Sequence, residues 1–195
     1  MSFSNKEMLF LIAYFLNKPL YGSIFNSIQA VIIGYIADHG YENLAYFNCI
    51  SVLLYMICEI IISFWRPEVL NTKEMFMHHL FTIIQILICL SNNVETMYCS
   101  RLTYILEFTT IFYFLHSHTT DKKIKDIIGL IFIIIFYIVR FPIFTYYVYE
   151  YYQDINAIGL LLPLMPVPYI LNIYWAYLMF LKVCRTINKN KQINK

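Results

Sequence analysis

Charged residues are scarce in this 195-residue sequence: they make up 13% of it, whereas soluble domains carry about a quarter. Hydrophobic residues make up 60%, and the mean hydropathy is +0.61. A chain so poor in charge cannot present an ordinary soluble surface to water, so its composition excludes a soluble domain. The sequence therefore predicts an all-α, polytopic membrane protein.

The sequence also lacks a cysteine framework. Its five cysteines are an odd number, and they are scattered through apolar runs without the spacing of zinc ligands or of a disulfide scaffold. Cys49, Cys58 and Cys89 are most simply small apolar residues. Cys89 and Cys99 flank one loop and could pair if that loop faces an oxidising lumen.

Six apolar stretches are long enough to be membrane-spanning helices. They cover residues 19–37, 44–65, 74–91, 97–116, 124–149 and 157–181. An earlier run, 7–16, has only ten residues and is too short to span, so we expect an interfacial helix there. The predicted organisation is a short N-terminal interfacial segment (1–18), a transmembrane domain (19–185) and a basic tail (186–195).

The positive charges predict how the spans are oriented. Of the 14 lysines and arginines, all but Arg101 and Arg140 fall at the N-terminus, in alternate loops or after the last span. Because basic loops stay in the cytosol, both termini are predicted to be cytosolic. The even number of spans agrees with this orientation.

The stretch 74–91 carries two adjacent histidines in an otherwise apolar run. At helical spacing it places one polar stripe on one face, with His79 beside it: Glu74, His78, Thr82, Gln85 and Cys89. Because imidazole is costly in hydrocarbon, such a stripe should face other helices or a watery cavity. Interhelical hydrogen bonding is the simpler interpretation for the last three residues. The histidine pair is a candidate functional site.

Counting about 1.5 Å per residue brings other polar groups to the depth of the histidine pair. Glu59 in the second span, His116 at the end of the fourth and Asn172 in the sixth share that depth. Glu107 and Arg140 lie deeper, and we expect Arg140 to form an ion pair with Glu107 or another acid. That pair could fix helix register or belong to the functional site.

The order of these features resembles the TLC domain, which ceramide synthases share with translocating-chain-associated membrane proteins. The matching segments are SVLLYMICEIIISFW with Glu59, FMHHLFTI with the histidines, LEFTTIFYFLH with Glu107 and His116, the arginine of YIVRFPIF, and LNIYWAYLMFLKVCR. The resemblance implies a helical bundle in an endoplasmic-reticulum-type membrane, with membrane lipids as partners. It also implies a link to lipid metabolism or lipid sensing.

The chain departs from ceramide synthases on the helix after the histidine pair. There the family carries a His-Asp pair and a further Asp, whereas Glu107 is the only acid in RLTYILEFTTIFYFLH. The acyl-transfer set is therefore incomplete, and the sequence is most similar to TLC-domain proteins without an assigned reaction.

Two functions remain open. In the first, a fatty acyl group passes from acyl-CoA, a co-substrate, to a lipid amine or alcohol. His78 or His79 would be nucleophile or general base, with Glu59 or Glu107 orienting the ring. The alternative is a non-catalytic protein that binds or senses lipid. The candidate binding residues are His116, Glu107, Asn172, Gln85 and Arg140.

In the acyl-transfer hypothesis, Asn172 could donate a hydrogen bond to a developing oxyanion. The histidines near the predicted cytosolic side are about half of what a membrane di-iron site needs, so no metal is expected. Nucleic acid is not expected as a partner.

Overall fold

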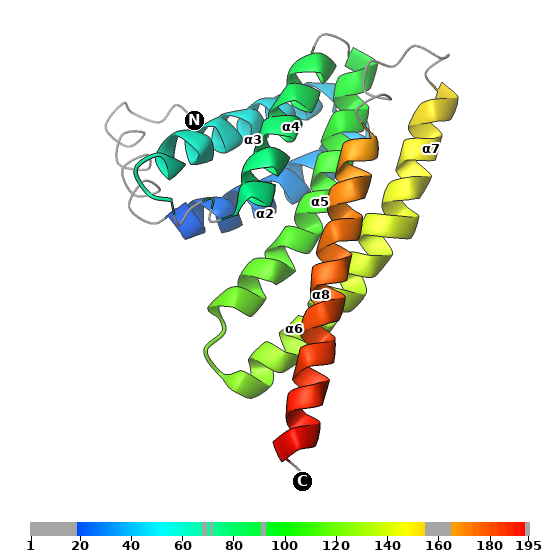
Figure 1. Ribbon diagram of the computed structural model, residues 1–195. Coiled ribbons are helices and arrows are strands. Elements are labelled where there is room, and N and C mark those ends of the chain that lie inside the picture. Colours follow the sequence, from blue (N-terminus) through cyan, green and yellow to red (C-terminus); the bar gives the residue numbers. More distant parts are fainter. Residues whose placement is uncertain (1–18, 68–69, 71, 91–92, 155–164, 194–195) are drawn as a thin grey trace.

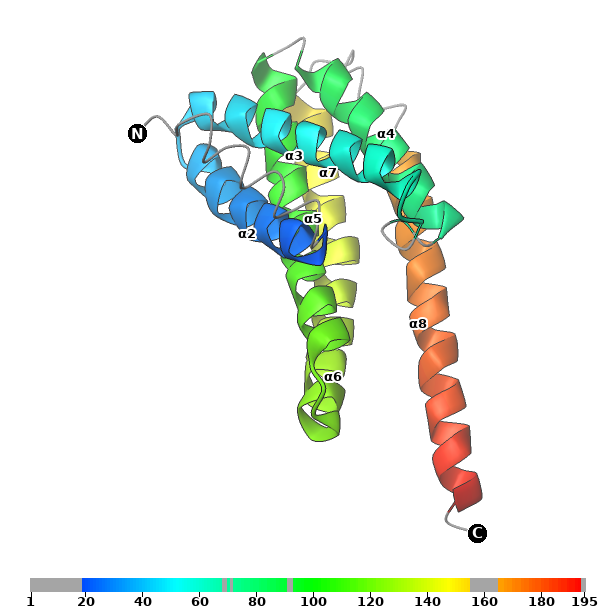
Figure 2. The ribbon, with the colours of Figure 1, turned by 90° about the vertical axis from the view of Figure 1, so that its left-hand side faces the viewer.

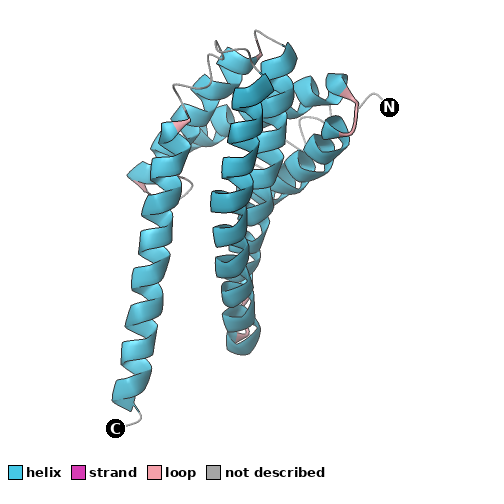
Figure 3. Ribbon diagram, turned by 90° about the vertical axis from the view of Figure 1, so that its right-hand side faces the viewer, coloured by secondary structure: helices cyan, strands magenta, loops and turns pink. Residues whose placement is uncertain are grey.

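The computed structural model describes residues 19–67, 70, 72–90, 93–154 and 165–193, and every regular element within them is helical (Figures 1 and 3). This confirms the predicted all-α helical bundle. The elements are α2 (Pro19–Asp38), α3 (Glu42–Ser63), α4 (Lys73–Cys89), α5 (Asn93–His118), α6 (Lys122–Ile138), the π-helix η1 (Val139–Ile143), α7 (Phe144–Asp154) and α8 (Pro166–Ile193). The expected interfacial helix at 7–16 lies outside the described residues.

Helices α2 and α3 form a hairpin that crosses α5 at a steep angle (Figures 1 and 2). Gly40 makes the turn between them with a φ of +108°, a conformation that residues with a side chain rarely adopt. Close packing follows from Gly34, because a Cβ there would lie 2.6 Å from Tyr104 Cβ on α5. It would also lie 2.9 Å from Asn48 Nδ2 on α3. The absence of a side chain at Gly34 therefore lets three helices meet.

A polar junction joins the turn of the α2–α3 hairpin to α5 and α7. Arg101 on α5 forms an ion pair with Asp38 at the end of α2, and its Nη1 lies 2.9 Å from Glu150 Oε2 on α7. The guanidinium also stacks over the rings of Tyr98 and Tyr147. Sequence reasoning noted Arg101 only as an isolated charge, and it did not anticipate this three-helix junction.

The predicted fifth span is one long helical rod with a widened turn in the middle. Helix α6 passes through η1 into α7 without a break, from Lys122 to Asp154. Pro142 lies inside η1. Because proline has no backbone N–H and clashes with the preceding turn, the chain widens locally instead of continuing as a regular α-helix. Arg140 sits in this widened turn.

Fewer described helices meet a length-and-apolarity criterion for a membrane span than the six that the sequence analysis counted. Three do: Asn43–Ser63, Lys122–Gln153 and Pro166–Arg185. Helix α4 has only 17 residues, and α5 is long but carries Glu95, Arg101 and Glu107 along its length. Polar residues that serve the interior therefore lower the hydropathy of helices that the six-span count treated as ordinary spans.

Helix α8 stands apart from the other helices over its C-terminal half (Figures 2 and 3). It packs mainly on α4 near its N-terminal end. It begins at Pro166, within the expected span of 157–181, of which residues 157–164 lie outside the described part of the chain. The helix also continues through residues 186–193, which the sequence analysis assigned to the tail.

Candidate functional site

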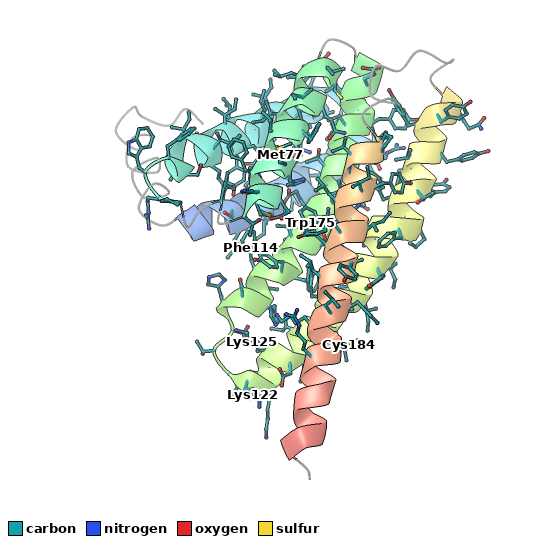
Figure 4. The ribbon with its side chains drawn as sticks, in the orientation of Figure 1. Met77, Phe114, Lys122, Lys125, Trp175 and Cys184 are labelled. Atoms are coloured by element: carbon teal, nitrogen blue, oxygen red, sulfur yellow. The ribbon has the colours of Figure 1, made fainter. Side chains whose placement is uncertain are left out.

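A cavity of about 600 Å³ lies among α2, α3, α4, α5, α6, η1 and α8. Its volume is within the range of small-molecule sites in proteins, about 300–1,000 Å³. One part of its wall is polar and includes Ser23, Glu59, His78, His79 and Arg140. Another part is apolar and aromatic, with residues from α5, α6 and α8: Tyr113, Phe114, Phe132, Phe136, Leu178 and Met179. Figure 4 labels two of the lining residues, Phe114 on α5 and Trp175 on α8.

A smaller cavity of about 60 Å³ adjoins it and is lined by Thr82 and Gln85 of α4. The two cavities share Met56, His78, Glu107 and Arg140 in their walls. The polar stripe of α4 therefore faces the interior, as predicted, and His78 lies at the boundary between the two cavities.

His79 is bound at both ring nitrogens. Its Nε2 lies 2.6 Å from Glu59 Oε2 on α3, and its Nδ1 lies 2.9 Å from the carbonyl oxygen of Met75 one turn earlier. The other Glu59 oxygen accepts a hydrogen bond from Ser23 on α2, at 2.7 Å, and Ser23 accepts one from Tyr55 at 2.6 Å. A continuous chain of hydrogen bonds thus joins three helices beside the cavity.

The geometry limits where protons can be in this chain. A carbonyl oxygen can only accept, so His79 Nδ1 carries a proton and donates it to Met75. One more proton must then lie between Nε2 and Glu59 Oε2, either on the imidazole or on the carboxyl. The pair is therefore a charge-assisted hydrogen bond with one shared proton, and His79 has no free nitrogen.

The ring of His78 is held differently. It packs edge-on against Trp175, with ring centroids 5.4 Å apart, and against His79, at 5.6 Å. In the part of the chain that the structure describes, the ring makes no hydrogen bond, while the His78 carbonyl accepts one from Thr82. Of the two adjacent histidines, His78 is therefore the one whose imidazole faces the cavity with its nitrogens available.

The predicted ion pair between Arg140 and Glu107 is not present. Arg140 Nε instead donates to Thr109 Oγ1 at 2.9 Å, and Nη2 donates to the Leu106 carbonyl at 3.0 Å. Its Nη1 donates to Asn172 Oδ1 at 3.2 Å. Glu107 accepts from Ser27 on α2 at 2.5 Å. The widened turn at Pro142 changes the direction in which Arg140 projects, which accounts for the different partners.

The remaining candidate residues lie in different places. Asn172 is buried and occupied by Arg140, donating to its carbonyl oxygen at 3.4 Å in return. Gln85 lines only the smaller cavity. His116 lines neither cavity, and its ring instead approaches Gly129 of α6. His116 was expected to share the depth of the histidine pair, but the two are not brought together, because His116 points from α5 toward α6.

Sequence reasoning missed four residues of the polar wall: Ser23, Tyr55, Thr109 and Trp175. One signal was available, since Tyr55 precedes Glu59 by one helical turn and so shares its face. No spacing in the sequence connects Ser23 to Glu59, because they lie on different helices.

The TLC domain family model matches residues 8–183, almost the whole chain. This chain belongs to the TLC domain family. No curated protein and no solved structure gave a match. As a TLC-domain protein with three helices apolar enough to span a bilayer, it is an integral, multi-pass membrane protein linked to lipid metabolism or lipid sensing. Its cavity therefore lies in a chain that functions among membrane lipids.

Proposed function

We propose that this TLC-domain protein transfers a fatty acyl group from an acyl thioester, such as acyl-CoA, to a lipid amine or alcohol bound in the larger cavity. The observation that carries the proposal is the unbonded imidazole of His78 in the cavity wall, beside the His79–Glu59 pair. A neutral imidazole is the side chain best matched to proton transfer near pH 7.

In the proposed reaction, His78 acts as general base. It removes the proton from the acceptor nitrogen or oxygen as that atom bonds to the acyl carbon. The carbon–sulfur bond then breaks, and the departing thiolate takes the proton from His78, so the products are an amide or ester and a free thiol. His79 and Glu59 position the helix that carries His78, and they hold a second proton next to it.

We also propose that the protein resides in an endoplasmic-reticulum-type membrane with both termini and the cavity mouth toward the cytosol. Two observations support this orientation. The cavity is lined by Thr72 and Glu74 at the start of α4 and by His118 at the end of α5. These positions adjoin Lys73 at the start of α4 and Lys122 at the start of α6, and the positive-inside rule assigns these basic helix ends to the cytosol.

Non-catalytic lipid binding or sensing is the second candidate, and one observation favours it. Both nitrogens of His79 are occupied inside the protein, at 2.6 Å and 2.9 Å, so half of the histidine pair serves the bundle. In that case the cavity holds a lipid without changing it.

Lipidomics on cells that express the intact chain distinguishes the two. The variants are His78→Ala and, as a matched control, His39→Ala, since His39 is exposed at the end of α2 and away from the cavity. Acyl transfer predicts a lipid class changed by the intact chain and by His39→Ala but unchanged by His78→Ala. If the purified protein binds lipid and yet no lipid class changes in cells, the binding function replaces the enzymatic one.

A further inference from the structure

The charge of Arg140 is buried beside the larger cavity without a carboxylate bound to it. Its exposed fraction is 7%, and within the described residues its hydrogen bonds go to three neutral oxygens, those of Thr109, Leu106 and Asn172. A guanidinium has five N–H groups, so two remain without an acceptor among the residues that the structure describes. A cation in an apolar interior is costly unless an anion or strong acceptors complete its shell.

Three acidic side chains line the same cavity, and each has another partner; Glu74 accepts from Tyr174 on α8 at 3.3 Å. Glu59 shares a proton with His79 and accepts from Ser23, and Glu107 accepts from Ser27. Arg140 is also fixed in place, since its guanidinium lies 5.6 Å from the ring centroid of Phe136 and 5.8 Å from that of Trp175. The structure thus holds a rigid, desolvated guanidinium in the cavity wall, with two N–H groups that no described residue accepts.

The cavity next to Arg140 continues into an apolar slot. Its walls come from the C-terminal half of α5 (Tyr113, Phe114), from α6 (Phe132, Phe136) and from α8 (Leu178, Met179). Beside it, α6 and α8 are in contact, since Tyr137 donates to the Ala176 carbonyl at 3.2 Å, and α8 separates from the other helices toward its C-terminal end (Figure 2). An amphiphile with one hydrocarbon chain matches a polar head compartment joined to a single apolar slot.

We infer that the acceptor lipid of the proposed reaction is a single-chain amphiphile that carries, beside the amine or hydroxyl to be acylated, an oxyanion, a phosphate or a carboxylate, bound by Arg140, with its chain in the slot between α5, α6 and α8. The role of this lipid as the acyl acceptor rests on the proposed function. The binding preference itself can be measured without turnover. Arg140 is suited to the headgroup because its planar donor fork matches the oxygens of carboxylate and phosphate.

The test is equilibrium binding to the full chain in a neutral detergent, with probes that share one chain and differ in head charge. These are hexadecyl phosphate, palmitate, hexadecanol and hexadecylamine, with inorganic phosphate as a chainless probe. We expect hexadecyl phosphate and palmitate to bind at least about 10-fold more tightly than hexadecanol, because hydrogen bonds to charged groups are the strong ones. Equal binding of palmitate and hexadecanol, or tighter binding of hexadecylamine, overturns the inference.

Three variants locate the effect. Arg140→Gln should bind palmitate and hexadecanol equally. Lys123→Gln, which removes one positive charge from the exposed start of α6, should keep the wild-type preference. Leu178→Trp should weaken all the hexadecyl probes together by filling the slot. A preference unchanged in Arg140→Gln would refute the role of Arg140.

The design stays decisive if Arg140→Gln does not fold, because the head-group series on the unmodified chain already tests the charge preference. Inorganic phosphate that competes as well as hexadecyl phosphate would refute the chain slot. An anion preference without any lipid change in cells leaves this binding inference standing and removes acyl transfer. A lipid change in cells without an anion preference in binding overturns this inference and leaves acyl transfer standing.

Discussion

Removing His79 or Glu59 alone should lower the stability of the protein at least as much as removing both. Glu59 is 7% exposed and His79 is 4% exposed, and their side chains meet at 2.6 Å between α3 and α4. Truncating one partner of a buried charged pair leaves the other without compensation, which typically costs about 3 to 5 kcal/mol. The cost of His79→Leu should lie near the lower end of this range, because Glu59 keeps its hydrogen bond from Ser23.

The double variant Glu59→Leu/His79→Leu leaves neither group buried alone. Replacing a buried ion pair with apolar residues of similar volume is often close to neutral, so its cost should be no greater than that of either single variant. The corresponding coupling energy is then at least about 3 kcal/mol, the cost of the more harmful single change. It can be measured as a double-mutant cycle from reversible unfolding in mixed micelles, followed by tryptophan fluorescence.

A control cycle pairs Glu59→Leu with His39→Leu, which share no partner, and these two changes should add. If the Glu59 and His79 changes also add to within about 0.5 kcal/mol, the shared-proton hydrogen bond is not a feature of the folded protein. The role of His79 in positioning His78 would then lose its basis.

Three further predictions concern packing, the buried arginine and orientation. Gly34→Ala should lower stability by about 1 to 3 kcal/mol in the same unfolding assay, because its Cβ meets Tyr104 Cβ at 2.6 Å; Gly129→Ala, whose Cβ meets only the ring of His116 at 3.0 Å, should cost less. Arg140→Leu should reduce the monodisperse fraction on size-exclusion chromatography, and a fraction equal to that of the parent would show that Arg140 is not needed for folding. Tags at the N- and C-termini should both be accessible to a cytosolic protease, and protection of either one contradicts the proposed topology.

The helices themselves were accessible to sequence reasoning. The boundaries expected at 19–37, 44–65 and 97–116 lie within four residues of those of α2, α3 and α5. Apolar runs interrupted by basic loops have a length set by the bilayer, so they are readable without tertiary information. The inward-facing stripe on α4 was readable for a similar reason, because helical periodicity decides which residues share a face.

The pairing of side chains across helices was not accessible in the same way. Depth along a helix can be counted, but rotation about its axis must also be known before two residues can be said to meet. His116, which was expected at the depth of the histidine pair, points toward Gly129 and away from the cavity. The link between Glu59 and Ser23 needed the hairpin of α2 and α3, whose close approach depends on Gly34.

Arg140 shows how one local event changes such a prediction. A regular helix advances about 100° per residue, so the extra residue of a π-turn rotates everything on one side of it by a comparable angle relative to the other. The expectation for Arg140 rested on charge and depth alone, which favoured Glu107 or another acid. The widened turn directs it instead to Thr109 and Asn172. The turn that contains this proline thus places a buried guanidinium in the cavity wall with two N–H groups that no described residue accepts, and the inferred anionic headgroup rests on this feature.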